Sequence, residues 1–214
     1  MLNFKCGRCG ECCKRYYVVS LPSEVKAQAA LLKMPEKDFI KGNMLLFLQL
    51  FPSDHNDKKI TVSSELLPKK FVALSESHLG RMPDFFIMLP LLAFRRRESG
   101  ECTFYGSKNA GCNIYNARPA ECRLFPFISD KKTDDYSKLY PFCQGLKLEG
   151  DDRSYLDLGF IHFEKMARYF SLVKEKGFSS LWGSWPKEGV ILLTDKLLGK
   201  ISEKDFFGML GPYT

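Results

Sequence analysis

The 214-residue sequence contains no long apolar run and no apolar leader. Its longest apolar stretches are residues 44–48 and 85–89, whereas a helix that spans a bilayer needs about 20 apolar residues. Residues 1–5 run directly into a cysteine, without the basic start and apolar stretch of a secretory signal. We therefore expect a cytoplasmic protein that has no membrane partner.

Histidine is scarce, and no catalytic group can be traced. His55, His78 and His162 are far apart in the sequence, and none forms a Ser–His–Asp or Cys–His pattern. The loop around Gly7 and Gly10 is too short and too rich in thiols to be a nucleotide-binding loop. We therefore assign no catalytic residue from the sequence.

Basic residues are spread along the chain instead of being concentrated in one segment. The formal net charge is +7 and the pI is about 8.9, but only residues 69–70 and 95–97 form basic runs. Thiolates bound to a metal would reduce this positive charge further. A nucleic-acid partner is therefore not expected.

Cysteine is abundant, and its eight copies fall into two sets. The first set, Cys6, Cys9, Cys12 and Cys13, lies within eight residues; the second is Cys102, Cys112, Cys122 and Cys143. A chain of this length with 45% hydrophobic residues can bury a core without disulfide staples. In a reducing compartment, metal ligation is the better explanation. Because the second set is too widely spaced for local chelation, we predict that folding brings both sets to one metal-binding region.

The number of thiols suits more than one kind of centre. Four thiolates complete a tetrahedral zinc site or hold an iron–sulfur cluster, so eight suit two zinc ions, two clusters, or one of each. The side chains of the adjacent Cys12 and Cys13 point in different directions, so we expect one of them to serve a second centre. Arg118 and Arg123 lie beside cysteines in sequence. They either donate to thiolate sulfur or bind an anion, or they bind local carbonyls.

These motifs resemble the YkgJ-type family of zinc- or iron-chelating CxxCxxCC proteins. The resemblance covers residues 6–145 and rests on Cys6-x-x-Cys9-x-x-Cys12-Cys13, Gly100-x-Cys102-x-Phe104, Cys112-x-Ile114-Tyr115-x-x-Arg118-Pro119-x-x-Cys122-Arg123-x-Phe125-Pro126 and Cys143-x-Gly145. All eight cysteine positions match, although Gln144 stands where the family often has proline. The resemblance implies metal chelation. A related cysteine motif occurs in flagellin lysine N-methylases, so the resemblance also implies a connection with protein methylation.

The fold that we predict is a single α+β domain over residues 1–214. Its irregular cysteine-rich metal centre, with short β-hairpin strands packed among helices, is expected at residues 4–17 and 100–146. A helical scaffold is expected at residues 22–50 and 152–176, and in the second segment Phe160 and Phe163 belong to an apolar face at helical spacing. Short strands are expected at residues 59–64 and 190–194. Gly100 predicts a hairpin turn, and Pro119 predicts the start of a short helix.

The favoured function is a metal-binding protein whose eight thiolates hold zinc or iron, including the possibility of an iron–sulfur cluster. One alternative is a metal-dependent redox or protein-modification enzyme related to methylation. Another is a metal-stabilised interaction module that presents the arginines at 95–97 and Arg118 to an acidic protein partner.

Overall fold

The computed structural model describes residues 6–69, 72–73, 76–77, 80–106, 111–127, 136–147, 154–176, 190–193 and 198–201. Helices and strands are both present, and the predicted α+β class is confirmed. The chain forms two compact units, the first from residues 1–36 and 94–166 and the second from residues 37–93 and 167–214. The prediction of one domain over the whole chain stays a prediction.

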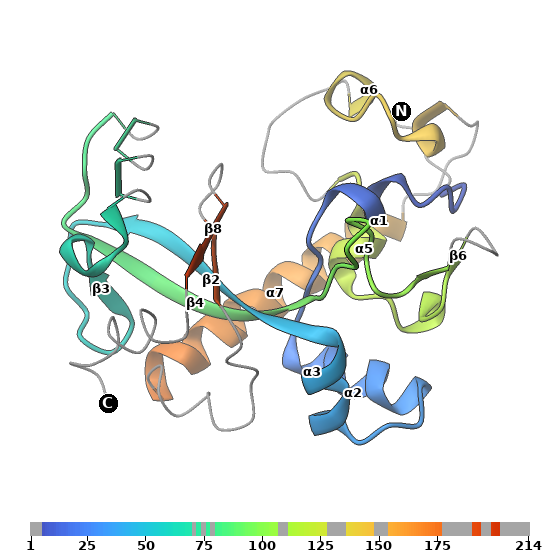
Figure 1. The fold of residues 1–214 in the computed structure, drawn as a ribbon, viewed down its shortest axis with the longest axis horizontal. Helices are drawn as coiled ribbons and strands as arrows, with labels where there is room; N and C mark the ends of the chain where they lie inside the picture. The colour runs from blue at the N-terminus through green and yellow to red at the C-terminus, as the bar shows by residue number, and fades with distance from the viewer. Residues whose placement is uncertain are drawn as a thin grey trace. The chain divides into compact units, whose positions relative to one another are not determined.

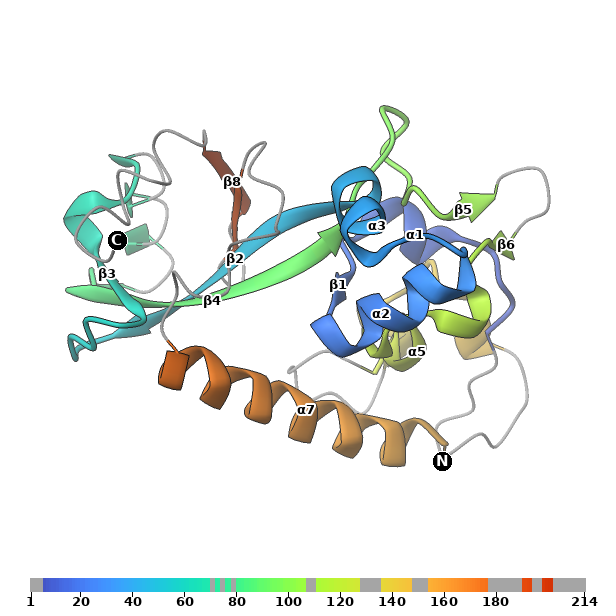
Figure 2. The ribbon, with the colours of Figure 1, turned by 90° about the horizontal axis from the view of Figure 1, so that it is seen from below.

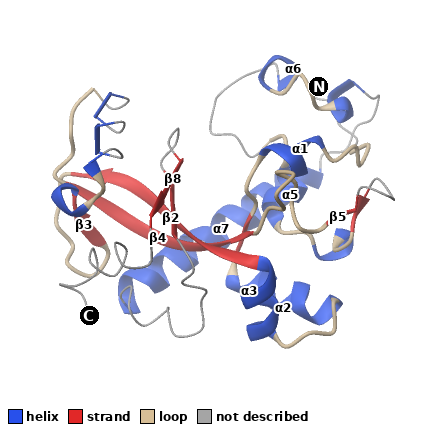
Figure 3. Cartoon of the chain, in the orientation of Figure 1, coloured by secondary structure: helices blue, strands red, loops and turns tan. Residues whose placement is uncertain are grey.

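The first unit consists mainly of short helices and loops (Figure 3). Its short elements are α1 (Glu11–Arg15), β1 (Val19–Ser20), α2 (Pro22–Leu31), β5 (Tyr105–Gly106), β6 (Gly111–Cys112), α5 (Ala120–Leu124) and α6 (Tyr136–Leu139), with 3-10 turns at Tyr115–Ala117 and Gln144–Lys147. Gly100 has a φ of +82° and turns the chain so that Arg96 and Cys102 form an antiparallel bridge, as predicted. The predicted short helix is α5, and Pro119 directly precedes it.

Two glutamates join the elements of the first unit. Glu24 in α2 accepts a hydrogen bond from the backbone N–H of Ala120 at 2.8 Å, which connects α2 to the start of α5. Glu121 in α5 accepts one from the N–H of Val19 at 2.6 Å, which connects α5 to β1. Burial raises the pKa of Glu121 to about 8. Glu121 is therefore mainly a neutral acceptor at neutral pH, inside the unit that carries the cysteines.

Replacing Glu121 with alanine should lower the free energy of unfolding by about 1–3 kcal/mol, because the Val19 N–H would lose its acceptor. Urea denaturation at matched metal content measures this change. Glu121→Gln retains an acceptor oxygen and should recover most of the loss. Equal destabilisation by both substitutions would contradict the hydrogen-bond explanation.

The second unit is organised around a β-sheet. Its strands are β2 (Met44–Ser53), β3 (Thr61–Ser63), β4 (Phe85–Phe94, whose last residue belongs to the first unit), β7 (Val190–Leu193) and β8 (Leu198–Ile201). The order is β4-β2-β7-β8, with β3 paired antiparallel to β4. The β2–β7 pair is parallel and the β7–β8 pair is antiparallel. Figure 1 shows β2 and β4 as long neighbouring strands. The strands predicted at 59–64 and 190–194 are present as β3 and β7.

The helical scaffold predicted for residues 22–50 is wrong over its last part. Helix α3 (Glu36–Asn43) ends at Asn43, and Met44–Ser53 forms strand β2. Leu46 and Leu48 are fully buried and Phe47 between them is almost fully buried, so both faces of this strand are covered. An apolar run that is buried on both faces has no alternation to distinguish it from a buried helix.

The helix predicted over residues 152–176 is present as α7 (Ser154–Lys176), which Figure 2 shows as one continuous helix. The apolar face predicted from Phe160 and Phe163 is wrong, because these side chains are 68% and 72% exposed. The buried positions nearer the end of the helix are Tyr169 and Val173. In the second unit, the Tyr169 hydroxyl donates to the carbonyl of Pro90 at 2.6 Å. None of the helices in the described ranges is long and apolar enough to cross a membrane.

Candidate metal centre

The first cysteine set lies on a tight loop that leads into α1. Gly10 precedes the helix with a φ of +77°, and its carbonyl accepts a hydrogen bond from the N–H of Lys14 at 3.1 Å. Cys12 and Cys13 are consecutive residues of α1. Consecutive helical side chains are separated by about 100° around the helix axis, yet the Cys12 and Cys13 side chains are close enough for a hydrogen bond between them. That one of the two serves a second centre stays a prediction.

Hydrogen bonds join the second cysteine set to this loop. The N–H of Cys102 donates to the carbonyl of Cys13 at 2.8 Å. The guanidinium of Arg96, which is bridged to Cys102, donates to the carbonyls of Lys14 and Arg15 at the end of α1. Segments that lie about ninety residues apart in sequence are thereby held side by side.

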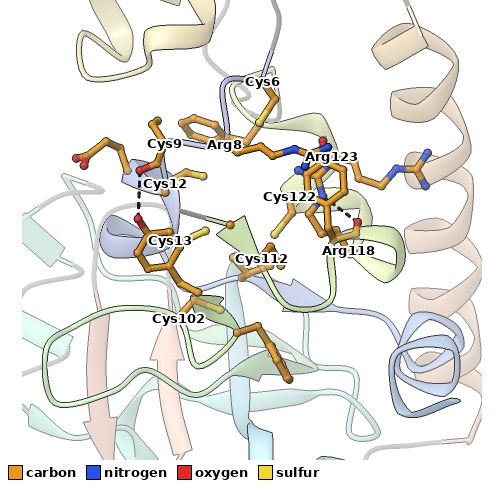
Figure 4. A pocket seen from close by; sticks show the side chains of 18 of the residues that line it. Cys6, Arg8, Cys9, Cys12, Cys13, Cys102, Cys112, Arg118, Cys122 and Arg123 are labelled. Carbon is orange, nitrogen blue, oxygen red and sulfur yellow. Dashed lines mark hydrogen bonds between the residues drawn. The ribbon is translucent and has the colours of Figure 1, made fainter. Parts of the chain in front are cut away.

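All eight cysteines line one cavity of about 710 Å³ in the first unit. Cys112 enters from β6, Cys122 from α5, and Cys143 from the residue before the 3-10 turn at Gln144–Lys147. Figure 4 shows Cys9, Cys12, Cys13, Cys102, Cys112 and Cys122 around a common space, with Cys6 farther out. All eight are free thiols; Cys6 is exposed, whereas Cys102 and Cys143 are buried. The two cysteine sets therefore meet at one cavity, as the sequence analysis predicted.

Burial disfavours the ionised form of several of these thiols. It is the main cause that raises the pKa of Cys102, Cys112, Cys122 and Cys143. The pKa of Cys12 is raised chiefly by a hydrogen bond with the Cys13 side chain and then by burial. A bound cation reverses this balance because it stabilises the thiolate form. Any metal that these thiols bind must therefore displace protons.

The sulfurs do not form a closed coordination shell as they stand. Across the described ranges, no three His, Cys, Asp or Glu side chains are placed so that they could hold a metal ion together. The cavity wall also carries aromatic rings, including Phe104, Phe125 and Phe142. Phe125 and Phe142 are stacked, with their ring centroids 6.2 Å apart. The region is a wide, thiol-lined and partly aromatic chamber.

The two arginines predicted to lie beside the cysteines occupy different environments. The guanidinium carbon of Arg118 lies 3.6 Å from the centroid of the Tyr115 ring, and its Nε donates to the Tyr115 carbonyl at 3.2 Å. This agrees with the carbonyl-binding alternative. Arg123 is exposed, and Figure 4 shows its side chain extending away from the cysteines. Their proposed action on thiolate sulfur stays a prediction.

Sequence reasoning missed Arg8. It lies between Cys6 and Cys9, lines the cavity, and stacks on the same Tyr115 ring at 4.0 Å. Its position inside the cysteine motif was the available signal, since a residue between two cavity-lining cysteines has to lie close to the cavity. His55 and His162 do not line the cavity, and His78 lies outside the described residues.

In comparison with known proteins, residues 5–144 match the family described as CxxCxxCC, "Putative zinc- or iron-chelating domain". The chain belongs to the CxxCxxCC family. The match covers more than half of the chain and ends one residue after Cys143, so it contains every cysteine that lines the cavity. It agrees with the family resemblance drawn from the motifs and supports zinc or iron as the metal. No curated protein and no solved structure matches the chain.

Gly10 is a sensitive position in the CxxCxxCC loop. An added Cβ would lie 2.1 Å from Cε2 of Tyr105, and the positive φ disfavours any other residue. We expect Gly10→Ala to destabilise the protein by about 1–3 kcal/mol and to reduce metal content, as measured by urea denaturation and elemental analysis. Gly7→Ala is the matched control, because a Cβ there meets nothing within 4 Å. Equal effects of the two substitutions would show that Tyr105 does not constrain the loop.

Proposed function

We propose that this protein is a metal-binding protein in which Cys6, Cys9, Cys12, Cys13, Cys102, Cys112, Cys122 and Cys143 hold zinc or an iron centre. The observation that carries the proposal is the presence of all eight free thiols on the wall of one cavity. Thiols gathered on the wall of one cavity can converge on a common metal centre, as ligation requires.

The chemistry of the donors favours metals that bind sulfur. Soft thiolate ligands suit zinc and iron–sulfur clusters, whereas magnesium and calcium prefer oxygen. Glu11 is the one carboxylate among the described residues of the cavity wall, and it pairs with Lys14 and Arg15 at 3.1 and 3.3 Å. No histidine of the described ranges lines the cavity. The ligands that the cavity offers are therefore cysteine thiolates, which can bind either zinc or an iron–sulfur cluster.

Metal binding would also organise the first unit. Because no three ligands are yet placed to hold an ion, binding would draw sulfurs inward from the cluster loop, β6, α5 and the segment at Cys143. A site assembled from such distant segments contributes its binding free energy to folding. The thiols that bind would release their protons, so metal affinity should rise with pH.

The direct test is elemental analysis with an absorption spectrum of protein purified without oxygen. About two zinc ions per chain and a colourless solution would indicate closed thiolate sites, as four thiolates complete each one. Iron together with acid-labile sulfide and visible absorption would indicate a cluster. Protein that stays free of both metals after anaerobic reconstitution would refute the proposal.

Replacing Cys9 or Cys122 with serine should remove metal and destabilise the fold, because a hydroxyl is a poor substitute for a thiolate ligand. We expect a loss of at least about one metal equivalent if the replaced thiol belongs to a closed four-ligand site. Elemental analysis and thermal denaturation measure the two effects. Thr103→Ser, which removes only a methyl group next to Cys102, is the control and should retain metal. A fully metal-loaded Cys122→Ser protein would contradict the assignment of that ligand.

A second candidate function is a metal-dependent redox or protein-modification enzyme. The observation that favours it is the size of the cavity, about 710 Å³, which is within the range of small-molecule binding sites. A closed structural zinc site needs no such space. The interaction module receives less support, because Arg96 and Arg97 donate to carbonyls of their own unit. These hydrogen bonds use some of the N–H donors that an acidic partner would need.

A further inference from the structure

Two arginines are stacked on one tyrosine at the wall of the cysteine cavity. The guanidinium carbons of Arg8 and Arg118 lie 4.0 and 3.6 Å from the centroid of the Tyr115 ring. All three residues line the cavity, and Figure 4 shows Arg8 extending from the cysteine loop towards Arg118. Guanidinium groups that stack on an aromatic ring keep their N–H edges free to donate in their own plane.

These guanidinium groups have no carboxylate partner within the part of the chain that the structure describes. Arg118 donates from Nε to the Tyr115 carbonyl, and Arg8 makes no side-chain hydrogen bond there. Glu11, on the same cavity wall, is already paired with Lys14 and Arg15. Most of the N–H donors of Arg8 and Arg118 are therefore available.

Arg8 and Arg118 bring two positive charges to one ring. An anion within reach of their outward N–H edges would offset the repulsion between these charges. Guanidinium groups match the geometry of carboxylate and phosphate oxygens and bind them with charge-assisted hydrogen bonds. The stacking on Tyr115 fixes both groups in advance, which reduces the entropy lost on binding.

The cavity has space for more than the oxyanion itself. Its volume of about 710 Å³ lies within the range of small-molecule binding sites, and Phe104, Phe125 and Phe142 supply an apolar wall. We propose that Arg8 and Arg118 form an oxyanion-binding site that anchors a carboxylate- or phosphate-bearing small molecule beside the cysteines. This deepens the proposed function and rests on it only in placing the ligand next to a metal centre.

The test uses the protein as purified with its metal, titrated with inorganic phosphate and separately with benzoate in isothermal calorimetry at constant ionic strength. Sodium chloride is the reference for non-specific screening. We expect saturable binding of at least one oxyanion, and weakening of at least about tenfold by Arg8→Gln or Arg118→Gln, because each removes a charge-assisted interaction. Preference for benzoate would indicate a carboxylate ligand that uses the aromatic wall, and preference for phosphate a phosphorylated one.

Two further variants keep the result interpretable. Arg97→Gln removes the same charge from an exposed arginine that is not among the lining residues, and should bind as the parent does. Arg118→Lys keeps the charge but loses the planar fork, so its binding should fall between those of the parent and Arg118→Gln. Urea denaturation establishes that each variant is folded. The proposal would be overturned if folded Arg8→Gln and Arg118→Gln bound the oxyanion as tightly as the parent. It would also be overturned if chloride gave the same binding heats as phosphate and benzoate.

Metal content measured in the same samples separates this proposal from the metal-binding one. A parent protein that holds metal but binds neither oxyanion would refute the anion site and leave the metal centre standing. A protein without metal that still binds the oxyanion through Arg8 and Arg118 would support the anion site and refute the metal centre. Loss of metal in Arg8→Gln with unchanged oxyanion binding would show that Arg8 only balances the charge of the centre, and would overturn the proposal.

Discussion

The backbone hydrogen bond from the N–H of Cys102 to the carbonyl of Cys13 is the constraint on which the cysteine chamber depends. It fixes the end of the first cysteine loop against the start of the second set. The contacts of Arg96 with the end of α1 reinforce the same junction. The remaining sulfurs on the cavity wall come from elements later in the chain, namely β6, α5 and the segment at Cys143.

The chamber balances two opposing electrostatic effects. Removing thiols from water penalises their ionised form, and this effect raises the pKa values of the buried cysteines. Positive charge on the wall acts in the other direction, and Arg118 lowers the pKa of Cys112 without overcoming burial. Metal binding would replace thiol protons with a cation and leave thiolate charge on the cavity wall.

Much of the centre could be predicted from sequence, because its signals are local and chemically distinctive. Gly100 and Pro119 marked the turn and the helix start, and the spacing of the cysteines indicated that the two sets should meet. Strand β2 was missed because a run buried on both faces has no periodicity to reveal it. The exposed Phe160 was misplaced because α7 carries more than one apolar stripe, and spacing alone does not say which one is covered. Arg8 was missed because a single residue between cysteines looks like a spacer until the fold places it on Tyr115.

The residues that line the cavity extend along the chain from Cys6 to Leu158, so the site cannot be moved to another protein as one short segment. A zinc knuckle can be transplanted as a short peptide because its ligands are neighbours in sequence. The Cys6–Cys13 segment is not such a portable part, because its carbonyls and its Gly10 are held by Cys102, Arg96 and Tyr105 from far along the chain. A fragment or graft that carries the cysteine motif alone would keep half of the donors and lose the walls that position them.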